Sequence, residues 1–335
     1  MSDFIFSEKQ YYNAVNIALN ADYKKIKSKK ISTWEEAWEN IKNNFPDINP
    51  EKEFEKLTNE GIELILDSDD NFPKNLKEMP WPPLAIYAKG NPKTIPGIAI
   101  VGTRKATTIG KNTAKQIAKK FSEVNYSVIS GLALGIDESA HSGALDGHGV
   151  TIAVLPTGIG NIYPRQNQGL AKKILENNGA IVSEFPIYYK PYISSFIQRN
   201  RIISALSQAT IIIEAPEKSG ALATARFALE QDREIFVIPG PVNHPNYTGS
   251  HKLIREGARL VTNAEEIFED LGIEIKKQKQ EELFKQLTQE ELIILEAINQ
   301  LGWPSSVDKI SEISKIQVQK ANQVIAFLTI KGILK

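Results

Sequence analysis

The sequence contains no cysteine, and it has no excess of charge of either sign. Without cysteine there is no disulfide, no thiolate nucleophile and no cysteine-ligated zinc, and the composition agrees with a reducing compartment. Forty basic and forty acidic side chains cancel, so the chain lacks the overall positive field of many duplex-DNA-binding proteins. Any phosphate-binding site must therefore be local.

Long apolar runs are missing as well. No run approaches the ~20 residues that a membrane-spanning helix needs, so we expect no membrane span. The amino-terminal MSDFIFSEKQ carries acidic residues, lacks a basic n-region and is followed by no small-residue cleavage site. We therefore expect no secretory signal and a cytoplasmic location. With 335 residues, of which 41% are hydrophobic and 24% charged, the chain has the composition of a globular protein of two or three domains.

Apolar periodicity and prolines divide the chain. Short helical patterns, with a possible N-cap at Ser32 or Thr33, predict a small helical module over residues 1–65. Its lysine-rich stretch at 24–30 could touch phosphate, but a solvated surface is the simpler interpretation. Prolines recur between Asn71 and Pro96 and predict an extended connector. The predicted segments are 1–65 (helical module), 66–96 (connector), 97–272 (main domain), 273–284 (polar linker) and 285–335 (winged-helix-like module).

Seven short apolar runs follow Pro96 and alternate with helical patterns. This rhythm predicts βαβ units and a parallel sheet. The runs are apolar throughout, as expected of strands covered by helices on both faces. The predicted fold class is α/β, with an extended Rossmann-like, doubly wound and mostly parallel sheet. The runs are 98–101, 127–129, 151–155, 180–182, 210–213, 234–238 and 259–261.

Glycines follow most of these predicted strands. Ligands of open α/β sheets bind at the carboxyl edge, where glycine lets backbone amides approach a phosphate and helix amino termini add free N–H donors. Several such loops together predict an extended anionic ligand. Basic side chains beside the loops could bind phosphate, although each could also form an ordinary surface ion pair. The glycines are Gly102, Gly131, Gly158, Gly220 and Gly240, and the basic residues are Arg104, Lys111, Arg165, Arg199 and Arg201.

Spacing argues against the common nucleotide sites. A Walker loop needs four residues between its glycines and Ser or Thr after the lysine, whereas Gly102 and Gly110 are too far apart and Asn112 follows Lys111. A dinucleotide fold needs GxGxxG and an acidic residue ending the second strand, whereas that strand ends at Ser130. ATP and NAD are therefore disfavoured, and no cofactor is predicted.

Catalytic motifs are equally sparse. There is no GxSxG elbow and no HExxH pair. Asp137 and His141 lie four residues apart on a probable helix and could share a metal, but two ligands do not make a site. A helix-capping Asp and a His bonded inside the fold are the simpler interpretation. We therefore predict no catalytic residue, no metal and no enzymatic activity.

Ten segments between Asn71 and Leu271 resemble the DNA-processing protein A (Smf) family. They are NFPKNL (71–76), WPPLAIYAKGN (81–91), IVGTRKAT (100–107), VISGLALGIDESAH (128–141), TIAVLPTGI (151–159), IYPRQN (162–167), SEFP (183–186), QRNRIIS (198–204), SGALATA (219–225) and REIFVIPG (233–240). The resemblance covers most of the chain.

This resemblance implies a cytoplasmic homodimer that binds single-stranded DNA in a basic pocket, protects incoming strands in natural transformation and recombination, and loads the RecA recombinase. The apolar run Phe236–Ile238, with Leu253 and Ile254, offers a self-complementary surface for such a dimer. Together with the edge argument, the resemblance gives a predicted DNA-binding set of Gly102, Arg104, Lys111, Ser130, Gly131, Gly135, Arg165, Arg199, Asn200, Arg201, Ser219, Gly220 and Thr224.

Two other functions stay open on sequence grounds. The sheet also resembles the nucleotide-binding phosphoribohydrolases, sometimes labelled lysine-decarboxylase-like, but their loop carries a glutamate soon after its threonine, and Thr224 is followed by Ala, Arg, Phe and Ala. A helix-turn-helix regulator needs a basic recognition helix, whereas residues 317–331 contain only Lys320 and Lys331. Because the chain stops at Lys335, the wing of the last module is expected to be truncated.

Overall fold

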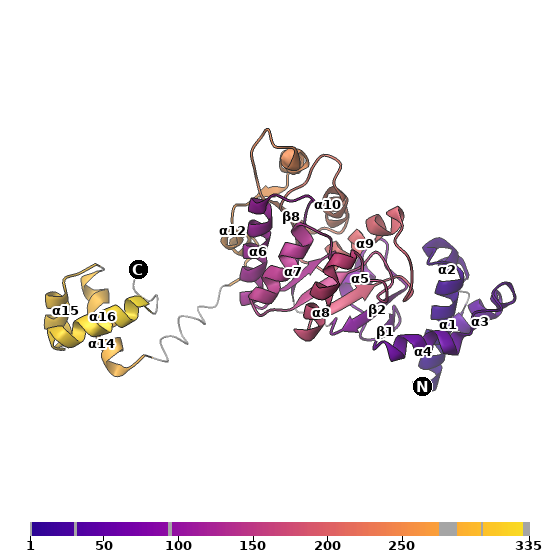
Figure 1. Cartoon of the computed structure of the whole chain (residues 1–335), viewed down its shortest axis with the longest axis horizontal. Coiled ribbons are helices and arrows are strands. Elements are labelled where there is room, and N and C mark those ends of the chain that lie inside the picture. Colours follow the sequence, from indigo (N-terminus) through magenta and orange to yellow (C-terminus); the bar gives the residue numbers. More distant parts are fainter. Residues whose placement is uncertain (1, 30–31, 93–95, 275–286, 303, 331–335) are drawn as a thin grey trace. The chain divides into compact units, whose positions relative to one another are not determined.

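The computed structural model describes residues 2–29, 32–92, 96–274, 287–302 and 304–330 (Figure 1). It divides into two compact units, Met1–Ile273 and Glu274–Lys335. Within the described residues, no helix combines the length and the apolar character needed to cross a bilayer. The larger unit contains the sheet and the amino-terminal helices, and the described residues of the smaller unit form three helices.

A nine-stranded sheet forms the centre of the larger unit, in the order β1-β2-β6-β5-β4-β3-β7-β8-β9. The seven strands from β6 to β9 in this order are parallel, and Ile98 pairs with Val128 on one side and with Ala209 on the other. The predicted parallel Rossmann-like sheet is confirmed. The strands are β3 (Gly97–Val101), β4 (Ser127–Ser130), β5 (Thr151–Val154), β6 (Ala180–Ser183), β7 (Ala209–Ile212), β8 (Glu234–Val237) and β9 (Arg259–Leu260).

The stretch 66–96 is not an extended connector, contrary to the sequence-based expectation. It includes a short helix, α5 (Lys74–Glu78), and the strand β2 (Ala85–Gly90). β2 pairs antiparallel with β6 on one side and with β1 (Glu63–Leu66) on the other. A proline removes only its own backbone donor, and no proline lies inside β2. The prolines therefore flank the strand and leave its ladder intact.

Helices cover both faces of the sheet, because strand residues of odd and even position are buried in different cores. Ile98 and Ile100 of β3 pack with α6 and α7, whereas Ala99 and Val101 belong to the core on the opposite face, with α9 and α10. This gives the doubly wound arrangement. One face carries α6 (Thr108–Glu123), α7 (Ile136–Asp146), α8 (Gln168–Glu176) and α12 (Ala264–Asp270), and the other carries α5, α9 (Ile193–Ala205), α10 (Gly220–Glu230) and α11 (Thr248–Arg255).

The amino-terminal helices pack against the antiparallel end of the sheet. Asn16 Nδ2 donates to the Tyr87 hydroxyl at 3.0 Å, and this hydroxyl donates to Asn13 Oδ1 at 2.9 Å, which ties α1 to β2. Thr33 caps α3 by accepting from the Glu36 amide at 3.2 Å. The elements are α1 (Ser2–Ala18), α2 (Tyr23–Lys29), α3 (Trp34–Glu39), η1 (Lys42–Asn44) and α4 (Pro50–Asn59).

The described part of the smaller unit contains α14 (Gln289–Leu301), α15 (Val307–Ser314) and α16 (Val318–Ile330), the three helices that the sequence predicts. Its core contains Ile294, Ile310 and Leu328, and a capping box between Thr288 and Glu291 begins α14. The expected truncated wing after residue 330 and most of the expected linker lie outside the described residues.

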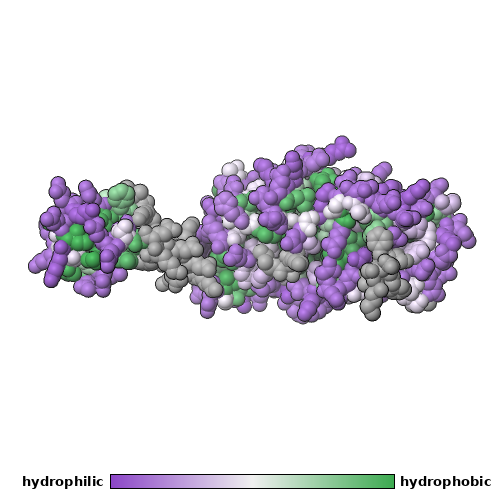
Figure 2. Space-filling model, turned by 90° about the horizontal axis from the view of Figure 1, so that it is seen from below, coloured by the Kyte–Doolittle hydropathy of each residue, from purple (hydrophilic) through white to green (hydrophobic). Residues whose placement is uncertain are grey.

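Figure 2 shows a mainly hydrophilic surface with smaller apolar areas on the face that it presents.

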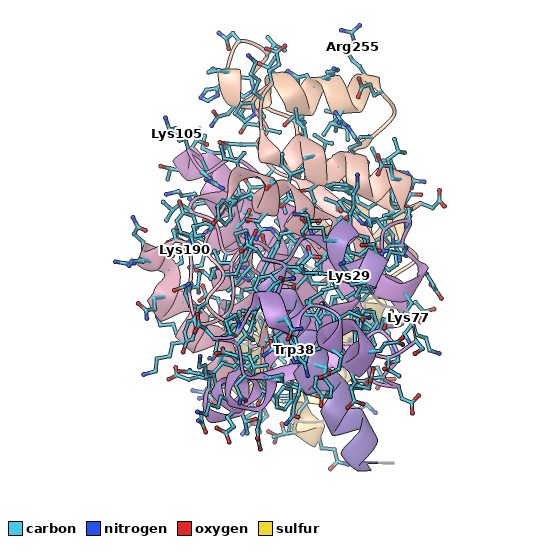
Figure 3. All side chains as sticks on the ribbon, turned by 90° about the vertical axis from the view of Figure 1, so that its right-hand side faces the viewer. Lys29, Trp38, Lys77, Lys105, Lys190 and Arg255 are labelled. Carbon is cyan, nitrogen blue, oxygen red and sulfur yellow. The ribbon has the colours of Figure 1, made fainter. Side chains whose placement is uncertain are left out.

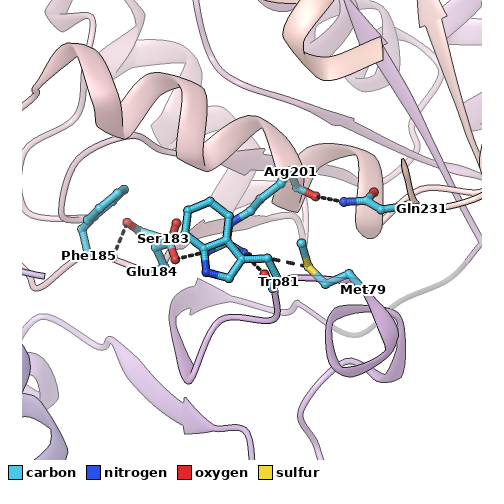
Figure 4. Close-up of polar contacts among 7 residues, drawn as sticks. All are labelled: Met79, Trp81, Ser183, Glu184, Phe185, Arg201 and Gln231. Atoms are coloured by element: carbon cyan, nitrogen blue, oxygen red, sulfur yellow. Dashed lines mark hydrogen bonds and ion pairs between the residues drawn. The ribbon is translucent and has the colours of Figure 1, made fainter. Parts of the chain in front are cut away.

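A buried ion pair joins three segments of the larger unit (Figure 4). Arg201 of α9 has none of its surface exposed, and its Nη2 pairs with the carboxylate of Glu184, which follows β6. Its Nη1 donates to the Trp81 carbonyl oxygen at 2.9 Å, and its guanidinium lies 4.9 Å from the centre of the Trp81 ring. Burial raises the pKa of Glu184, and Arg201 opposes that shift. The pair thus fixes the segment before β2 against β6 and α9.

Arg201→Met is expected to cost about 3–5 kcal/mol of unfolding free energy, because it leaves the Glu184 carboxylate buried without its cation. The double variant Arg201→Met/Glu184→Leu should recover much of that loss, since it removes both charges. Urea unfolding measures both, with Arg255→Met on the exposed surface of α11 as the control, expected within about 0.5 kcal/mol of wild type. A loss at Arg201 no larger than at Arg255 would show that the pair is not structural.

Candidate nucleic-acid interface

The loops after β3, β4 and β7 and one side of α9 surround a cavity of about 320 Å³ at the carboxyl edge of the sheet. We call it the edge cavity. Its lining combines backbone of glycine-rich loops with cationic and apolar side chains. Seven predicted residues line it, namely Gly102, Arg104, Arg199, Asn200, Ser219, Gly220 and Thr224, together with unpredicted residues that include Thr103, Asp137, Phe196, Ile197 and Lys218.

The amino terminus of α10 forms one wall of the edge cavity. The Ser219 side chain caps the helix by accepting from the Ala221 amide at 3.2 Å. A Cβ added at Gly220 would meet no atom within 4 Å, so open space lies beside this first helical residue. The first amides of an α-helix have no partner inside the helix and carry part of the positive end of its dipole. This wall suits a phosphate oxygen.

Arg199 forms a rigid cationic floor beneath the same cavity. Its Nη1 donates to the Gly131 carbonyl at 2.7 Å and also to the Val154 carbonyl, and its Nε donates to Asn200 Oδ1 at 3.0 Å. Burial lowers the pKa of Arg199 to about 10, with Asp137 opposing the shift, so the group stays cationic at neutral pH. A Cβ at Gly131 would lie 2.4 Å from Nη1, which explains the glycine.

Asp137 and His141 are bonded inside the fold. Asp137 Oδ2 accepts from the amides of Gly131 at 3.1 Å and Ala133 at 3.4 Å, and His141 Nδ1 lies 2.6 Å from Thr151 Oγ1. Burial raises the pKa of Asp137, while Arg199 and the amides lower it, and burial lowers the pKa of His141 to about 3. Both side chains are thus bonded inside the fold, but Asp137 satisfies loop amides and does not cap α7, whose N-cap residue is Gly135.

An exposed cation lies on an aromatic ring at the mouth of the edge cavity. The Arg104 guanidinium lies 4.8 Å from the centre of the Phe196 ring, and Tyr163 meets Phe196 edge-on with ring centres 5.5 Å apart. These residues, with Gly131 and Arg199, line a smaller adjoining cavity of about 60 Å³. The sequence analysis did not predict either aromatic residue. Tyr163 lies in the segment IYPRQN (162–167), and Phe196 lies three residues before Arg199, so their places beside predicted residues were the available signal.

The other predicted residues are not brought to the cavities. Lys111 and Arg165 are exposed on α6 and at the start of η2 (Arg165–Asn167), and neither lines a cavity described above. Ser130 is fully buried and donates its hydroxyl to the Ile100 carbonyl at 2.7 Å. Gly135, with φ of +85°, packs where a Cβ would lie 2.5 Å from the Thr103 carbonyl.

Arg201 requires a correction. The sequence places it in the phosphate-binding run Arg199–Arg201, but its side chain is buried and paired with Glu184. Successive residues of an α-helix project about 100° apart, so Arg199 and Arg201 serve opposite sides of α9. Arg201 therefore supports the fold and offers no charge to a ligand.

Glu214, which follows β7, is a second residue that sequence reasoning missed. Its buried carboxylate accepts from the Thr107 amide at 3.0 Å, Asn246 Nδ2 at 2.7 Å and the Tyr247 hydroxyl at 3.1 Å. Burial and the neighbouring Glu214 raise the pKa of Tyr247 to about 12. Thr107 caps α6 and ends the loop that carries Arg104. Glu214 thus fastens that loop to η3 (Pro245–Tyr247), and a charged residue directly after a buried apolar strand is the signal that could have found it.

Comparison with known proteins gives a family for this architecture. The model of the DNA recombination-mediator protein A family matches residues 63–272. The chain belongs to this family.

Relatives in the recombination-mediator family include protein Smf of Escherichia coli, 41% identical over 210 residues, or 62% of this chain and 56% of that protein. The DNA processing protein DprA of Bacillus subtilis is 40% identical over 215 residues, which cover 63% of this chain and 72% of that protein. The match thus spans little more than half the length of the Escherichia coli relative.

Two solved structures of the family resemble the larger part of this chain. DNA processing protein A from Streptococcus pneumoniae has a TM-score of 0.63 and 30% identity, covering 78% of this chain and 92% of that one. The protein from Helicobacter pylori, whose structure concerns its single-stranded DNA binding mode, has a TM-score of 0.57 and 31% identity, covering 63% and 95%.

Gly110→Ala is expected to lower stability by about 1–3 kcal/mol, because the new Cβ would lie 2.3 Å from Glu214 Oε1 in a packed site. Gly169→Ala is the matched control: it also lies in a helix, α8, but its Cβ would meet nothing within 4 Å. That variant should gain up to about 1 kcal/mol from helix propensity. Thermal unfolding compares the two. If the two variants unfold at the same temperature, Glu214 can move away from the new methyl group at position 110 without loss of stability.

Proposed function

We propose that this protein binds single-stranded DNA in the edge cavity without catalysing a reaction, and that it thereby protects incoming strands and loads the RecA recombinase in natural transformation and recombination. The observation that carries the proposal is the Arg104 guanidinium lying on the Phe196 ring at the mouth of the cavity, above buried Arg199. The handover to RecA is supported by family membership alone.

A single strand fits this arrangement better than a duplex does. Aromatic rings and arginine planes stack on bases that are exposed, and a duplex keeps its bases stacked on one another. The positive end of the α10 dipole and the cation of Arg199 suit phosphate oxygens. The cavity therefore combines a phosphate site with a base-stacking platform.

A phosphoribohydrolase would carry a glutamate soon after the threonine of its loop, and this chain has no such glutamate after Thr224. Thr224 lines the edge cavity and is followed by Ala225 and Arg226. The carboxylate in the lining, Asp137, accepts two backbone amides and is buried. A general acid or base must reach the substrate, so this arrangement favours binding over hydrolysis. We also propose a cytoplasmic location, which the absence of cysteine supports.

The test is a salt-titrated binding assay with labelled single-stranded and duplex oligomers. Wild type should prefer the single strand, with a log–log salt slope of about −0.7 for each phosphate contacted. Arg104→Ala should lose about 1–3 kcal/mol of single-strand affinity, because a charge-assisted contact disappears, and Arg104→Lys should recover only part of it. The melting temperature should hardly change, since Arg104 is exposed.

Arg255→Ala is the matched control, because Arg255 is exposed on α11 and lines neither cavity of the site. Its affinity should equal that of wild type. Equal binding of both DNA forms, or release of a free base from AMP, would contradict the proposal. A lower melting temperature for Arg104→Ala with unchanged affinity would make Arg104 a structural residue.

We also propose a homodimer, on a surface that keeps Leu253 from the one that the sequence suggested but excludes the run Phe236–Ile238. Phe236 and Val237 have no exposed surface and Ile238 is 8% exposed, so that run belongs to the core. Leu229 on α10 is instead 69% exposed and borders a groove of about 550 Å³ that Ile235 and Leu253 also line. Arg233 Nε in this groove is buried without a hydrogen-bond partner among the described residues. A second copy would cover the exposed leucine.

Leu229→Arg is expected to convert the dimer to a monomer, because it places an unpaired charge in an apolar contact. Light scattering at micromolar concentration measures the mass. Leu292→Arg, at an exposed leucine of α14, is the control and should remain dimeric. A wild-type protein of monomer mass would refute the dimer, and a dimeric Leu229→Arg would move the interface elsewhere.

A further inference from the structure

Trp81 differs from the other described tryptophans in being exposed. Its exposure is 38%, against 1% for Trp34 and 5% for Trp38. The ring is nevertheless held firmly: Arg201 lies against it at 4.9 Å, and its own backbone carbonyl accepts from Arg201. Tyr23 meets the ring at 5.5 Å with the two planes 87° apart. A fixed, solvent-accessible indole loses little conformational entropy when another flat group stacks on it.

A run of lysines adjoins this indole. α2 buries only Ile26 and exposes Lys24, Lys25, Lys27 and Lys29. Lys25 pairs with Asp22 at 3.4 Å, and the Lys27 ammonium lies 5.8 Å from the centre of the Tyr23 ring. Like charges three and four residues apart destabilise a helix, so this cluster works against α2. Its charge is better explained by an anionic ligand than by helix stability.

A second helix contributes positive charge from the segment that leads to Trp81. Lys74 and Lys77 of α5 are exposed, and Lys77 comes into view together with Lys29 on the side shown in Figure 3. Lys27, Tyr23 and Trp81 form a continuous chain of ring and cation contacts. We call Tyr23, Trp81, Lys24 and Lys27 the Trp81 surface. It combines cations with aromatic rings, as single-strand-binding surfaces do.

One helix joins the Trp81 surface to the edge cavity. On α9, Ile197 and Asn200 line the edge cavity, and the next residue, Arg201, holds Trp81. The two sites therefore lie on different sides of the same rigid element. A strand that leaves the edge cavity along α9 would meet the exposed side chains of Ile197 and Ile193, which are 50% and 86% exposed.

We propose that the Trp81 surface is a second contact for single-stranded nucleic acid, used by strands too long for the edge cavity alone. This inference rests on the proposed function of the edge cavity. Lysines would contact phosphates and the indole would stack on a base. A duplex cannot offer an unstacked base to Trp81. An acidic peptide would contact the lysines but would not stack on the indole.

The test compares oligothymidylates of about 6 and about 30 nucleotides; the shorter lies within the ~4–16 nucleotides typical of one single-strand site, and the longer exceeds that range. Lys24→Glu/Lys27→Glu should weaken binding of the long oligomer by about tenfold and reduce its salt slope by about 1.4, the equivalent of two phosphate contacts. Binding of the short oligomer should be unchanged. Trp81→Leu keeps the backbone carbonyl that Arg201 needs and should also weaken only the long oligomer.

Lys172→Glu/Lys173→Glu on α8 is the charge-matched control, because both lysines are exposed and line neither site. It should leave both oligomers unaffected, and unfolding curves of all variants establish that they fold. Equal losses for short and long oligomers, or no loss in the lysine variant, would overturn the second contact. A wild type that binds neither oligomer would instead refute the proposed function of the edge cavity.

Discussion

The carboxyl edge of a parallel sheet leaves backbone groups that no neighbouring strand can pair, and the larger unit is organised around satisfying them. Arg199 donates to the carbonyl of Gly131, which follows β4, and to the carbonyl of Val154, which ends β5. Asp137 accepts amides of the loop after β4, and Glu214 accepts the Thr107 amide. An unsatisfied buried group costs about 1–3 kcal/mol. Buried charges therefore make this edge rigid, and rigidity is what a preformed ligand site requires.

The cationic side chains at this edge differ in how far their charge is neutralised. Arg201 is paired with Glu184 and contributes no free charge. Arg199 faces Asp137 but satisfies carbonyls rather than a carboxylate, so part of its field reaches the cavity. Arg104 is exposed on an aromatic ring. On a chain with no net charge, this gradation concentrates the positive field where a strand can reach it.

Patterns that depend on neighbours in sequence were predictable, and features that depend on neighbours in space were not. Every parallel strand matched an apolar run. The strands β3, β4, β5, β6 and β7 are buried throughout because helices cover both faces of the sheet there, whereas the outer strands β8 and β9 expose Glu234 and Arg259. β2 was missed, because the prolines around it indicated a connector. Of the five glycines that suggested a site at this edge, Gly102 and Gly220 line the edge cavity. Phe196 and Glu214 acquire their roles from Arg104 and Thr107, which lie far away in the sequence. Arg199 and Arg201 look alike in sequence, and only the side of α9 that each occupies separates them.

The described part of the smaller unit differs from the carboxyl edge of the sheet in the sign of its charge. Among its described residues, acidic side chains outnumber basic ones, and Lys320 of α16 is paired with Glu290 at 3.3 Å. A helix that reads a DNA groove needs free cations for the phosphates on either side. α16 instead exposes Phe327 to 60%. The described part of α16 therefore offers no free cation to a phosphate, whereas the larger unit exposes Arg104 at the carboxyl edge of its sheet and lysines beside Trp81.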